Sequence, residues 1–339
     1  MSNAAQKKDT TPAPLDALSA LLHEDMKCVN AEILARMDSP VAMIPQVASY
    51  LIAAGGKRIR PLLTLAATKI YGANKDQMNR AYRLSAAVEF IHSATLLHDD
   101  VVDESEQRRG QDAANLIFGN QAAVLVGDFL FSRAFQLMVA DGNLEVLRIL
   151  SDASAIIAQG EVMQLSTTGN LETTLEDYED VIKAKTAALF TAACEVGPVL
   201  TEQDAAQAKA MADYGLYLGM AFQIIDDVMD YSSASTKMGK TAGDDFREGK
   251  MTAPVIYALQ NADAEEQDFW RRTLERKEQQ DGDLEHANAL LAKHIAHERS
   301  IELANSYGAK ATAAIEIIPE GEIRDLLQST IDFTINREF

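Results

Sequence analysis

The chain has 339 residues, with 31 Lys and Arg against 51 Asp and Glu, a formal net charge of −20. This excess of acid argues against general nucleic-acid binding and against attachment to anionic lipid by charge. The two cysteines, Cys28 and Cys194, are too few for a disulfide framework, which fits a reducing compartment. No uninterrupted apolar run reaches the roughly 18 residues of a membrane span, and the N-terminus lacks the apolar core of a secretory signal. We therefore expect a cytoplasmic protein with no membrane span.

The N-terminal segment differs in amino-acid composition from the rest of the chain. Residues 1–14 are small and polar and contain two prolines, so we expect a disordered arm there and one domain over 15–339. The stretch 262–299 is more charged and less periodic than its surroundings. We expect it to form a peripheral insertion or a pair of surface helices.

Helical periodicity dominates the region from Leu15 onward, where apolar residues recur every three or four positions. Leu84, Val88 and Ile91 form one such stripe. The absence of proline between Pro61 and Pro198 permits long, uninterrupted helices. Strand signals are weak, because only 6% of residues are aromatic and no sustained alternation is bounded by Asn-Gly or Asp-Gly turns. The pattern predicts an all-α fold, a single-domain bundle of about a dozen helices.

Two acidic motifs of the form DDxxD, at residues 99–103 and 226–230, each end an apolar helical run. A spacing of four places Asp99 and Asp103 on one helix face, and the second motif repeats the arrangement. Like charges at this spacing, near a helix C-terminus, are unfavourable without a cation. Oxygen ligands of this kind favour Mg²⁺, particularly where the ion also holds a phosphate. The alternative interpretation is two solvated acidic helix ends.

Cationic side chains gather near these motifs despite the negative net charge. They are Lys57, Arg58, Arg60, Arg108, Arg109, Lys185, Lys240 and Lys250. Arginine offers a planar fork for phosphate oxygens and lysine a point charge. Each residue alone is most simply a surface salt-bridge partner, but as a set with two DDxxD motifs they indicate a phosphate-binding site.

The order and spacing of these motifs resemble those of the trans-polyprenyl diphosphate synthase family. The resemblance runs from about residue 20 to 335 and rests on GGKRIRP, EFIHSATLLHDDVVDESEQRRG, GDFLF, KT, FQIIDDVMD and GKTAGDDFREGK, in that order. It implies an all-α fold around a deep central cavity, with the two acidic motifs facing each other across its mouth. It also implies a homodimer that binds isopentenyl diphosphate and an allylic diphosphate, with transient membrane contact for product release.

The resemblance also assigns roles to individual residues. The metal site, with about three Mg²⁺ ions, comprises Asp99, Asp103 and Asp226 as ligands, with Asp100, Asp227 and Asp230 in support. The allylic diphosphate is contacted by Arg108, Lys185 and Lys240, with Gln223 and Thr186 near the reacting carbon. Isopentenyl diphosphate is held without metal by Lys57, Arg60, His92 and Arg109. Lys250 matches a basic residue of a closing loop. The residues expected to act in catalysis are Asp99, Asp103, Lys185, Thr186, Gln223, Asp226 and Lys240.

The implied chemistry is prenyl transfer. Mg²⁺ and cationic side chains stabilise the departing diphosphate, so that the allylic C–O bond ionises. The double bond of isopentenyl diphosphate then attacks the carbocation, and the proton is lost to the released diphosphate. Backbone carbonyls of Lys185 and Thr186 and the side-chain oxygen of Gln223 stabilise positive charge in this scheme. Holding both substrates in line contributes most through positioning.

The resemblance implies that product length depends on the side chains four and five positions before the first acidic motif. Ala94 and Thr95 are small, which favours an open tunnel and a long product over a role in close helix packing alone. Among Phe131, Phe135 and Met138, we expect Met138 to form the floor, because it lies farthest along its helix. The prediction is an all-trans product of about forty to fifty carbons, of the kind used for ubiquinone side chains.

Other functions remain possible on the sequence. A short-chain synthase would make farnesyl or geranylgeranyl diphosphate. A terpene cyclase shares the first acidic motif but has no need of the isopentenyl pocket, whereas a non-catalytic regulatory subunit of a heteromeric synthase would be expected to lose acidic motifs. An acidic helical cation-binding protein leaves the ordered cations unexplained.

Overall fold

The computed structural model describes residues 14–53, 56–108, 110–231 and 243–336, and these are helical almost throughout. The first helices are α1 (Pro14–Leu21), α2 (His23–Met37), α3 (Met43–Ala53), α4 (Ile59–Lys69), α5 (Lys75–Val102), α6 (Ala114–Phe118), α7 (Asn120–Asp141) and α8 (Leu144–Thr167). The others are α9 (Leu175–Ile182), α10 (Ala188–Leu200), α11 (Ala205–Asp230), α12 (Asp244–Glu248), α13 (Ala253–Leu259), α14 (Ala264–Trp270), α15 (Asp283–Lys293), α16 (Ala296–Ala314) and α17 (Glu322–Ile335).

Irregular helical turns and one hairpin complete the described elements. π-Helical turns span Lys183–Ala187 and Arg271–Glu275, and a 3₁₀ turn spans Ile315–Ile317. Strands β1 (Gln107–Arg108) and β2 (Gln111–Asp112) pair antiparallel. The all-α prediction is confirmed, and short helices such as α6 and α12 add to the expected dozen. Residues 1–13 of the predicted arm lie outside the described residues, and Pro14 is the first residue of α1.

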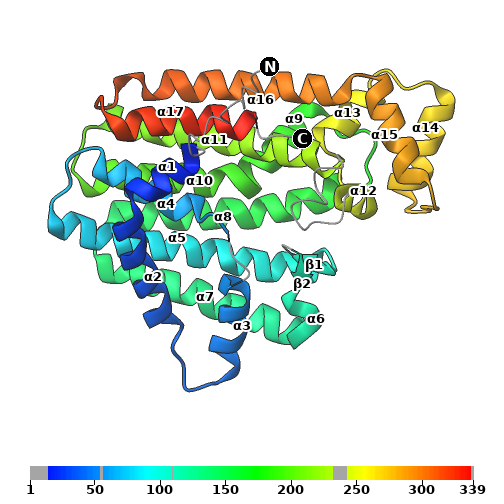
Figure 1. Cartoon of the computed structure of the whole chain (residues 1–339). Coiled ribbons are helices and arrows are strands. Elements are labelled where there is room, and N and C mark those ends of the chain that lie inside the picture. The colour runs from blue at the N-terminus through cyan, green and yellow to red at the C-terminus, as the bar shows by residue number, and fades with distance from the viewer. Residues whose placement is uncertain (1–13, 54–55, 109, 232–242, 337–339) are drawn as a thin grey trace, which may run out of the picture.

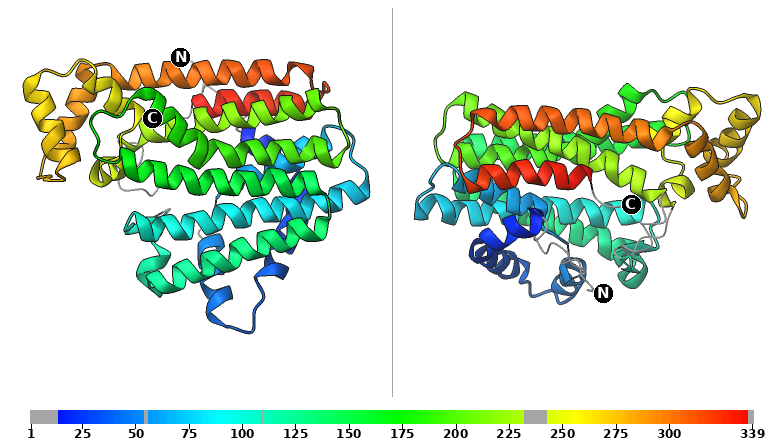
Figure 2. Two further views of the ribbon diagram at one scale, coloured as in Figure 1. Left: turned by 180° about the vertical axis from the view of Figure 1, so that it is seen from behind. Right: turned by 45° about the horizontal axis from the view of Figure 1, so that its top comes forward.

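The long helices run side by side in successive layers (Figures 1 and 2). Helix α5 packs between α7 and α4, and α10 contacts α4, α8 and α11. Helix α16 covers the other side of α11, with α17 beside it. The two helices that end in the acidic motifs, α5 and α11, therefore lie on either side of α10, and both end at the same end of the bundle.

Local signals explain why α5 is long and where it starts and stops. The Asn74 side chain accepts hydrogen bonds from the backbone N–H groups of Asp76 and Gln77, and the Gln77 side chain accepts one from Asn74 in return, which forms a capping box. The helix ends where Asp103 forms the C-cap and Glu104 takes a positive φ of 50°. Its C-terminus thus presents the first acidic motif at the end of the bundle.

Two glycines let neighbouring helices approach the π-helical turn Lys183–Ala187. A Cβ on Gly160 of α8 would lie 2.7 Å from the backbone nitrogen of Lys185, and one on Gly219 of α11 would lie 2.7 Å from the Cα of Ala187. Real Cβ atoms do not approach other atoms this closely. The turn is therefore held between α8 and α11, and π-helical turns of this kind are frequent at functional sites.

The charged stretch 262–299 forms a peripheral helical pair, as one of the two sequence interpretations expected. Helices α14 and α15 project from one end of the bundle (Figure 1). Trp270 is fully buried beneath them, and Arg272 donates two hydrogen bonds to the carboxylate of Asp283 at 2.7 and 2.8 Å. The buried apolar residues of α14 and α15, such as Trp270 and Leu291, belong to the same core as the main bundle.

Helix α7 is, within the described residues, the one helix long and apolar enough to cross a bilayer, with a mean hydropathy of 1.5. It nevertheless carries Asp128 and Arg133, which interrupt its apolar sequence. It also packs along α5 within the bundle. A core helix of a bundle meets the same criterion of length and composition, and the contacts of α7 with α5 fit that interpretation.

Candidate active site

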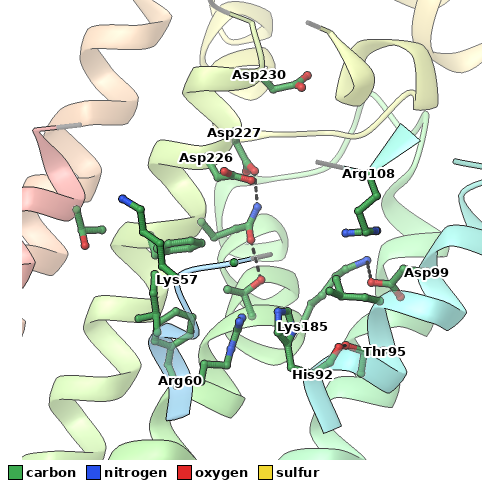
Figure 3. Close-up of a pocket in the computed structure, with 18 of the residues that line it drawn as sticks. Lys57, Arg60, His92, Thr95, Asp99, Arg108, Lys185, Asp226, Asp227 and Asp230 are labelled. Atoms are coloured by element: carbon green, nitrogen blue, oxygen red, sulfur yellow. Dashed lines mark hydrogen bonds and ion pairs between the residues drawn. The ribbon is translucent and has the colours of Figure 1, made fainter. Parts of the chain in front are cut away.

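A cavity of about 510 Å³ opens where α5 and α11 end (Figure 3). Both acidic motifs line it. The predicted residues on its wall are Lys57, Arg60, His92, Thr95, Asp99, Asp103, Arg108, Lys185, Thr186, Gln223, Asp226, Asp227, Asp230 and Lys250. The predicted residues Arg109 and Lys240 lie outside the described part of the chain. The structure thus brings together side chains from α5, the π-helical turn, α11 and the segment after α12.

Each carboxylate of the first motif that faces the cavity lies next to a lysine. Lys185 Nζ is 3.7 Å from Asp99 Oδ2, and Lys250 Nζ is 3.1 Å from Asp103 Oδ2. The second pair joins the C-terminus of α5 to the segment after α12, and its two residues are 147 positions apart in sequence. The carboxylate oxygens of Asp99 and Asp103 therefore already interact with cationic groups.

Asp100, the middle carboxylate of the first motif, is turned away from the cavity and fully buried. Its Oδ1 accepts a hydrogen bond from Arg108 Nε at 2.6 Å, and its backbone carbonyl accepts one from Asn115 at 3.0 Å. Burial raises the pKa of Asp100, and the Arg108 guanidinium opposes that rise. Its position therefore supports Arg108 and not a direct metal contact.

A chain of hydrogen bonds fixes the polar groups beside the second motif. Thr186 Oγ1 donates to Gln223 Oε1 at 2.7 Å, and Gln223 Nε2 donates to Asp227 Oδ1 at 2.7 Å (Figure 3). Tyr178 completes the chain by donating its hydroxyl to the other oxygen of Asp227 at 2.6 Å. Asp227 is buried, which raises its pKa well above the ordinary value. The chain holds the Gln223 amide and the Thr186 hydroxyl in one orientation.

The remaining carboxylates of this side come from the second motif and from α12. Asp226 lines the cavity, and Asp230 Oδ2 accepts a hydrogen bond from the backbone N–H of Asp245 at 2.9 Å. Asp244, Asp245 and Glu248 also line the cavity, although the sequence analysis assigned them no role. Their signal was present in the GKTAGDDFREGK motif, where the two aspartates and the glutamate precede Lys250.

Glu161 of α8 is a further cavity residue that sequence reasoning missed. Its Oε2 accepts a hydrogen bond from Lys185 Nζ at 2.6 Å. Burial, reinforced by the nearby charge of Asp99, raises the pKa of Glu161 to about 7. In sequence it is one glutamate on an apolar helical run after Gly160, with nothing to mark it as a site residue.

The residues predicted to hold the second substrate lie at another part of the wall. Lys57 Nζ sits 4.8 Å from the ring centre of Phe333, and the Arg60 guanidinium 4.4 Å from that of Phe190. His92 of α5 faces the same part of the cavity (Figure 3). Helix α17, which carries Phe333, therefore forms part of the wall, and no feature of the sequence predicted that contact.

The residues expected to set product length fall in two places. Thr95 lines the cavity, and its hydroxyl donates to the carbonyl of His92 at 2.9 Å. Ala94 and Met138 are buried in the core and do not line the described cavity. Of the other floor candidates, Phe131 and Phe135 have ring centres 5.3 Å apart, and Phe135 is partly exposed.

The donor set of the cavity fits a hard divalent cation. Asp99 and Asp103 offer carboxylate oxygens that already lie beside ammonium groups. Among the described residues, no three His, Cys, Asp or Glu side chains form a ready-made metal cage. Mg²⁺ typically takes one or two carboxylates and completes its coordination with water and substrate phosphate, which matches this arrangement.

Comparisons with known proteins agree with the all-α fold. Residues 41–291 match the family model described as "Polyprenyl synthetase". The chain is 40% identical to an octaprenyl diphosphate synthase of Haemophilus influenzae over 96% of this chain and 98% of the relative. A decaprenyl diphosphate synthase structure from Rhodobacter capsulatus is 50% identical, with a TM-score of 0.91 over 96% of this chain and 99% of that one. A polyprenyl synthase structure from Caulobacter crescentus, complexed with calcium and isoprenyl diphosphate, is 47% identical with a TM-score of 0.92, over 98% of this chain and 99% of that one.

Proposed function

The chain belongs to the polyprenyl synthetase family, and from this premise we propose how its residues make a long-chain all-trans polyprenyl diphosphate. It is a prenyltransferase that condenses isopentenyl diphosphate with an allylic diphosphate. The observation that carries the mechanism is the shared cavity, which both acidic motifs and the cationic set line from separate helices. Farnesyl or geranylgeranyl diphosphate synthesis, the short-chain alternative, is not favoured by these relatives.

The metal site is assigned to the two acidic motifs. We propose Asp99, Asp103 and Asp226 as ligands and Asp227 and Asp230 as supporting carboxylates, with about three Mg²⁺ ions per site. Bound Mg²⁺ would neutralise the diphosphate and make it a better leaving group. The calcium in the related Caulobacter crescentus structure supports a divalent cation.

The two diphosphates are assigned to separate parts of the wall. Arg108 and Lys185, beside the first motif, bind the allylic diphosphate, and Lys250, which pairs with Asp103 of the same motif, adds a third cation. Lys57, Arg60 and His92 bind isopentenyl diphosphate near α17. The family resemblance adds Lys240 to the first group and Arg109 to the second.

With the two diphosphates bound at separate parts of the wall, the reaction joins their hydrocarbon chains. The allylic C–O bond breaks, and its electron pair leaves with the diphosphate, whose charge Lys185 and Arg108 stabilise. The π electrons of isopentenyl diphosphate form the new C–C bond, and a proton passes from the condensed chain to the released diphosphate. We assign the stabilisation of positive charge at the reacting carbon to the backbone carbonyls of Lys185 and Thr186 and to the Gln223 side-chain oxygen, which the Thr186 hydroxyl orients.

Product length is assigned to the wall behind the first motif. Thr95 lines the cavity and Ala94 lies buried next to it, and neither offers bulk that would block a growing chain. We keep Met138 as the proposed floor for a product of about forty to fifty carbons, which suits a quinone side chain. An unchanged product-length distribution in Met138→Ala would exclude that role.

The exposed apolar side chains of α7 and α8 support a homodimer. Leu125 and Val139 of α7 and Val162 and Leu165 of α8 are each more than 60% exposed. Apolar residues gathered on the exposed faces of two helices are typical of a subunit interface. Light scattering should give twice the monomer mass, and Leu125→Glu should lower it. We place the enzyme in the cytoplasm, with transient membrane contact when the apolar product leaves.

One assay tests the function directly. Purified protein is incubated with Mg²⁺, farnesyl diphosphate and labelled isopentenyl diphosphate, and the products are resolved by length. We expect chains of forty to fifty carbons, whereas products of fifteen or twenty carbons would support the short-chain alternative. A folded protein that incorporates no label would refute the synthase assignment, and full activity in Asp99→Ala would refute the metal role.

A further inference from the structure

The lysines beside the first acidic motif share a feature that the proposed mechanism does not use. Each is bound to two carboxylates, an aspartate of the motif and a glutamate from another helix. Lys185 lies between Asp99 at 3.7 Å and Glu161 at 2.6 Å. Lys250 lies 3.1 Å from Asp103 and also pairs with Glu248 of α12.

The two glutamates come from two different helices of the cavity wall. Glu161 is on α8 and Glu248 is at the end of α12, and neither belongs to a DDxxD motif. The side chains of Lys185, Asp99 and Glu161 are at most about one-quarter exposed. Ion pairs this far from bulk water interact more strongly than surface pairs.

A metal ion that enters the first motif faces a specific obstacle. It must take oxygens that already interact with Lys185 and Lys250, and an ammonium group left unpaired in a half-buried site is strongly unfavourable. Glu161 removes this obstacle for Lys185. Its Oε2 already holds Nζ, and its Oε1 is buried and accepts no hydrogen bond. Glu161 can therefore accept a second hydrogen bond when Nζ leaves Asp99.

We propose that Glu161 and Glu248 are positioning residues, which retain Lys185 and Lys250 when a divalent cation takes Asp99 and Asp103. The inference rests on the metal assignment made in the proposed function. The glutamates keep both ammonium groups at the mouth, where a diphosphate then meets metal and lysine together. The matching arrangement at the two lysines argues against a chance contact at either one.

The test measures Mg²⁺ affinity of the full-length protein by calorimetry, with Mg²⁺ alone and no diphosphate. A pH of about 8.5 keeps Glu161 ionised, above its pKa of about 7. Glu161→Gln should weaken Mg²⁺ binding about tenfold, because Lys185 then has only Asp99 as a partner. Lys185→Met should tighten binding. Adding Glu161→Gln to Lys185→Met should cost less than about threefold, since the lysine to be retained is gone.

A matched control removes one charge from the same helix away from the site. Glu145, in the first turn of α8, pairs with Arg148 and lies about 24 Å along the helix from Glu161. Glu145→Gln should leave Mg²⁺ affinity unchanged. Thermal unfolding of each variant shows that it is folded before affinities are compared.

Distinct results would overturn the proposal. An unchanged affinity in Glu161→Gln, or an equal loss in Glu145→Gln, would exclude a positioning role. A tenfold loss that persists in the Lys185→Met background would make Glu161 act on the metal directly and not through the lysine. The same cycle with Glu248→Gln and Lys250→Met tests the second side independently. A wild-type protein that binds no Mg²⁺ would instead refute the metal assignment itself.

Discussion

Gly160 of α8 offers the sharpest test of how packing builds the active site. A Cβ at this position would lie 2.7 Å from the backbone nitrogen of Lys185 and 2.8 Å from the Cβ of Ala184. Ordinary contact begins near 3.5 Å, so Gly160→Ala lacks about 0.8 Å of space between α8 and the π-helical turn. Both closest atoms belong to a rigid helical segment, so the two elements must separate.

The separation has two measurable consequences. Moving α8 by about 0.8 Å would stretch the 2.6 Å bond between Glu161 and Lys185 beyond about 3.2 Å, the upper end of hydrogen-bond range. Overpacking of this kind costs about 1–3 kcal/mol of unfolding free energy. Misplacement approaching 1 Å at catalytic groups lowers kcat/KM by about 100-fold. We therefore expect Gly160→Ala to lose both stability in urea and activity in the prenyl-transfer assay.

Gly308 of α16 provides a control that separates the two effects. A Cβ there would meet the terminal Cδ1 of Ile335 at 2.3 Å, the flexible end of a side chain that does not itself line the cavity. Gly308→Ala should lower stability but leave kcat/KM within about twofold of wild type, since no catalytic group moves. Wild-type kcat/KM in Gly160→Ala, or an equal loss in Gly308→Ala, would refute the reasoning.

Three further outcomes follow from other contacts. Tyr178→Phe removes the 2.6 Å hydrogen bond to buried Asp227 and should lower the unfolding free energy by about 1–3 kcal/mol in urea titration; a change below about 0.5 kcal/mol would contradict this. Ile295 is a β-branched residue in the left-handed region, at a φ of +47°. Ile295→Gly should therefore raise the unfolding free energy by about 0.5–1 kcal/mol, whereas Ile317→Gly should not, because Ile317 has a negative φ. The pKa of Glu161 is raised from 4.5 to about 7, so the folded protein holds this proton more tightly than the unfolded chain. Metal-free protein should lose this contribution to stability as the pH rises from about 4.5 to about 7, and Glu161→Gln should flatten that slope; an unaltered slope would argue against the assignment.

Features that depend on neighbours in sequence were predictable. The three-to-four periodicity of residues such as Leu84, Val88 and Ile91 indicated helices, and the all-α fold is confirmed. The spacing of Asp99 and Asp103 placed both on one face of a helix end, and both line the cavity. These predictions succeeded because helical period and side-chain direction are local properties of the backbone.

Contacts between helices were not predictable in the same way. Glu161 and Lys185 are 24 residues apart in sequence, and Tyr178 and Asp227 are 49 apart. The sequence around one residue of each pair gives no signal that identifies its partner. Phe333 beside Lys57 depends on how α17 lies across the mouth. In each case the helix was foreseeable, but its partner was not.

Asp100 illustrates the difference between what the sequence predicts and what the tertiary structure adds. Its predicted role in the first motif is a supporting one, and the fold shows what it supports, because its carboxylate is fully buried and accepts a hydrogen bond from Arg108. The sequence alone determined the helices, the two acidic motifs and the cationic set that mark the family. Only the tertiary structure decided which carboxylates face the cavity and which cation each one holds, because helix rotation and close packing at Gly160 set the side-chain directions across helices.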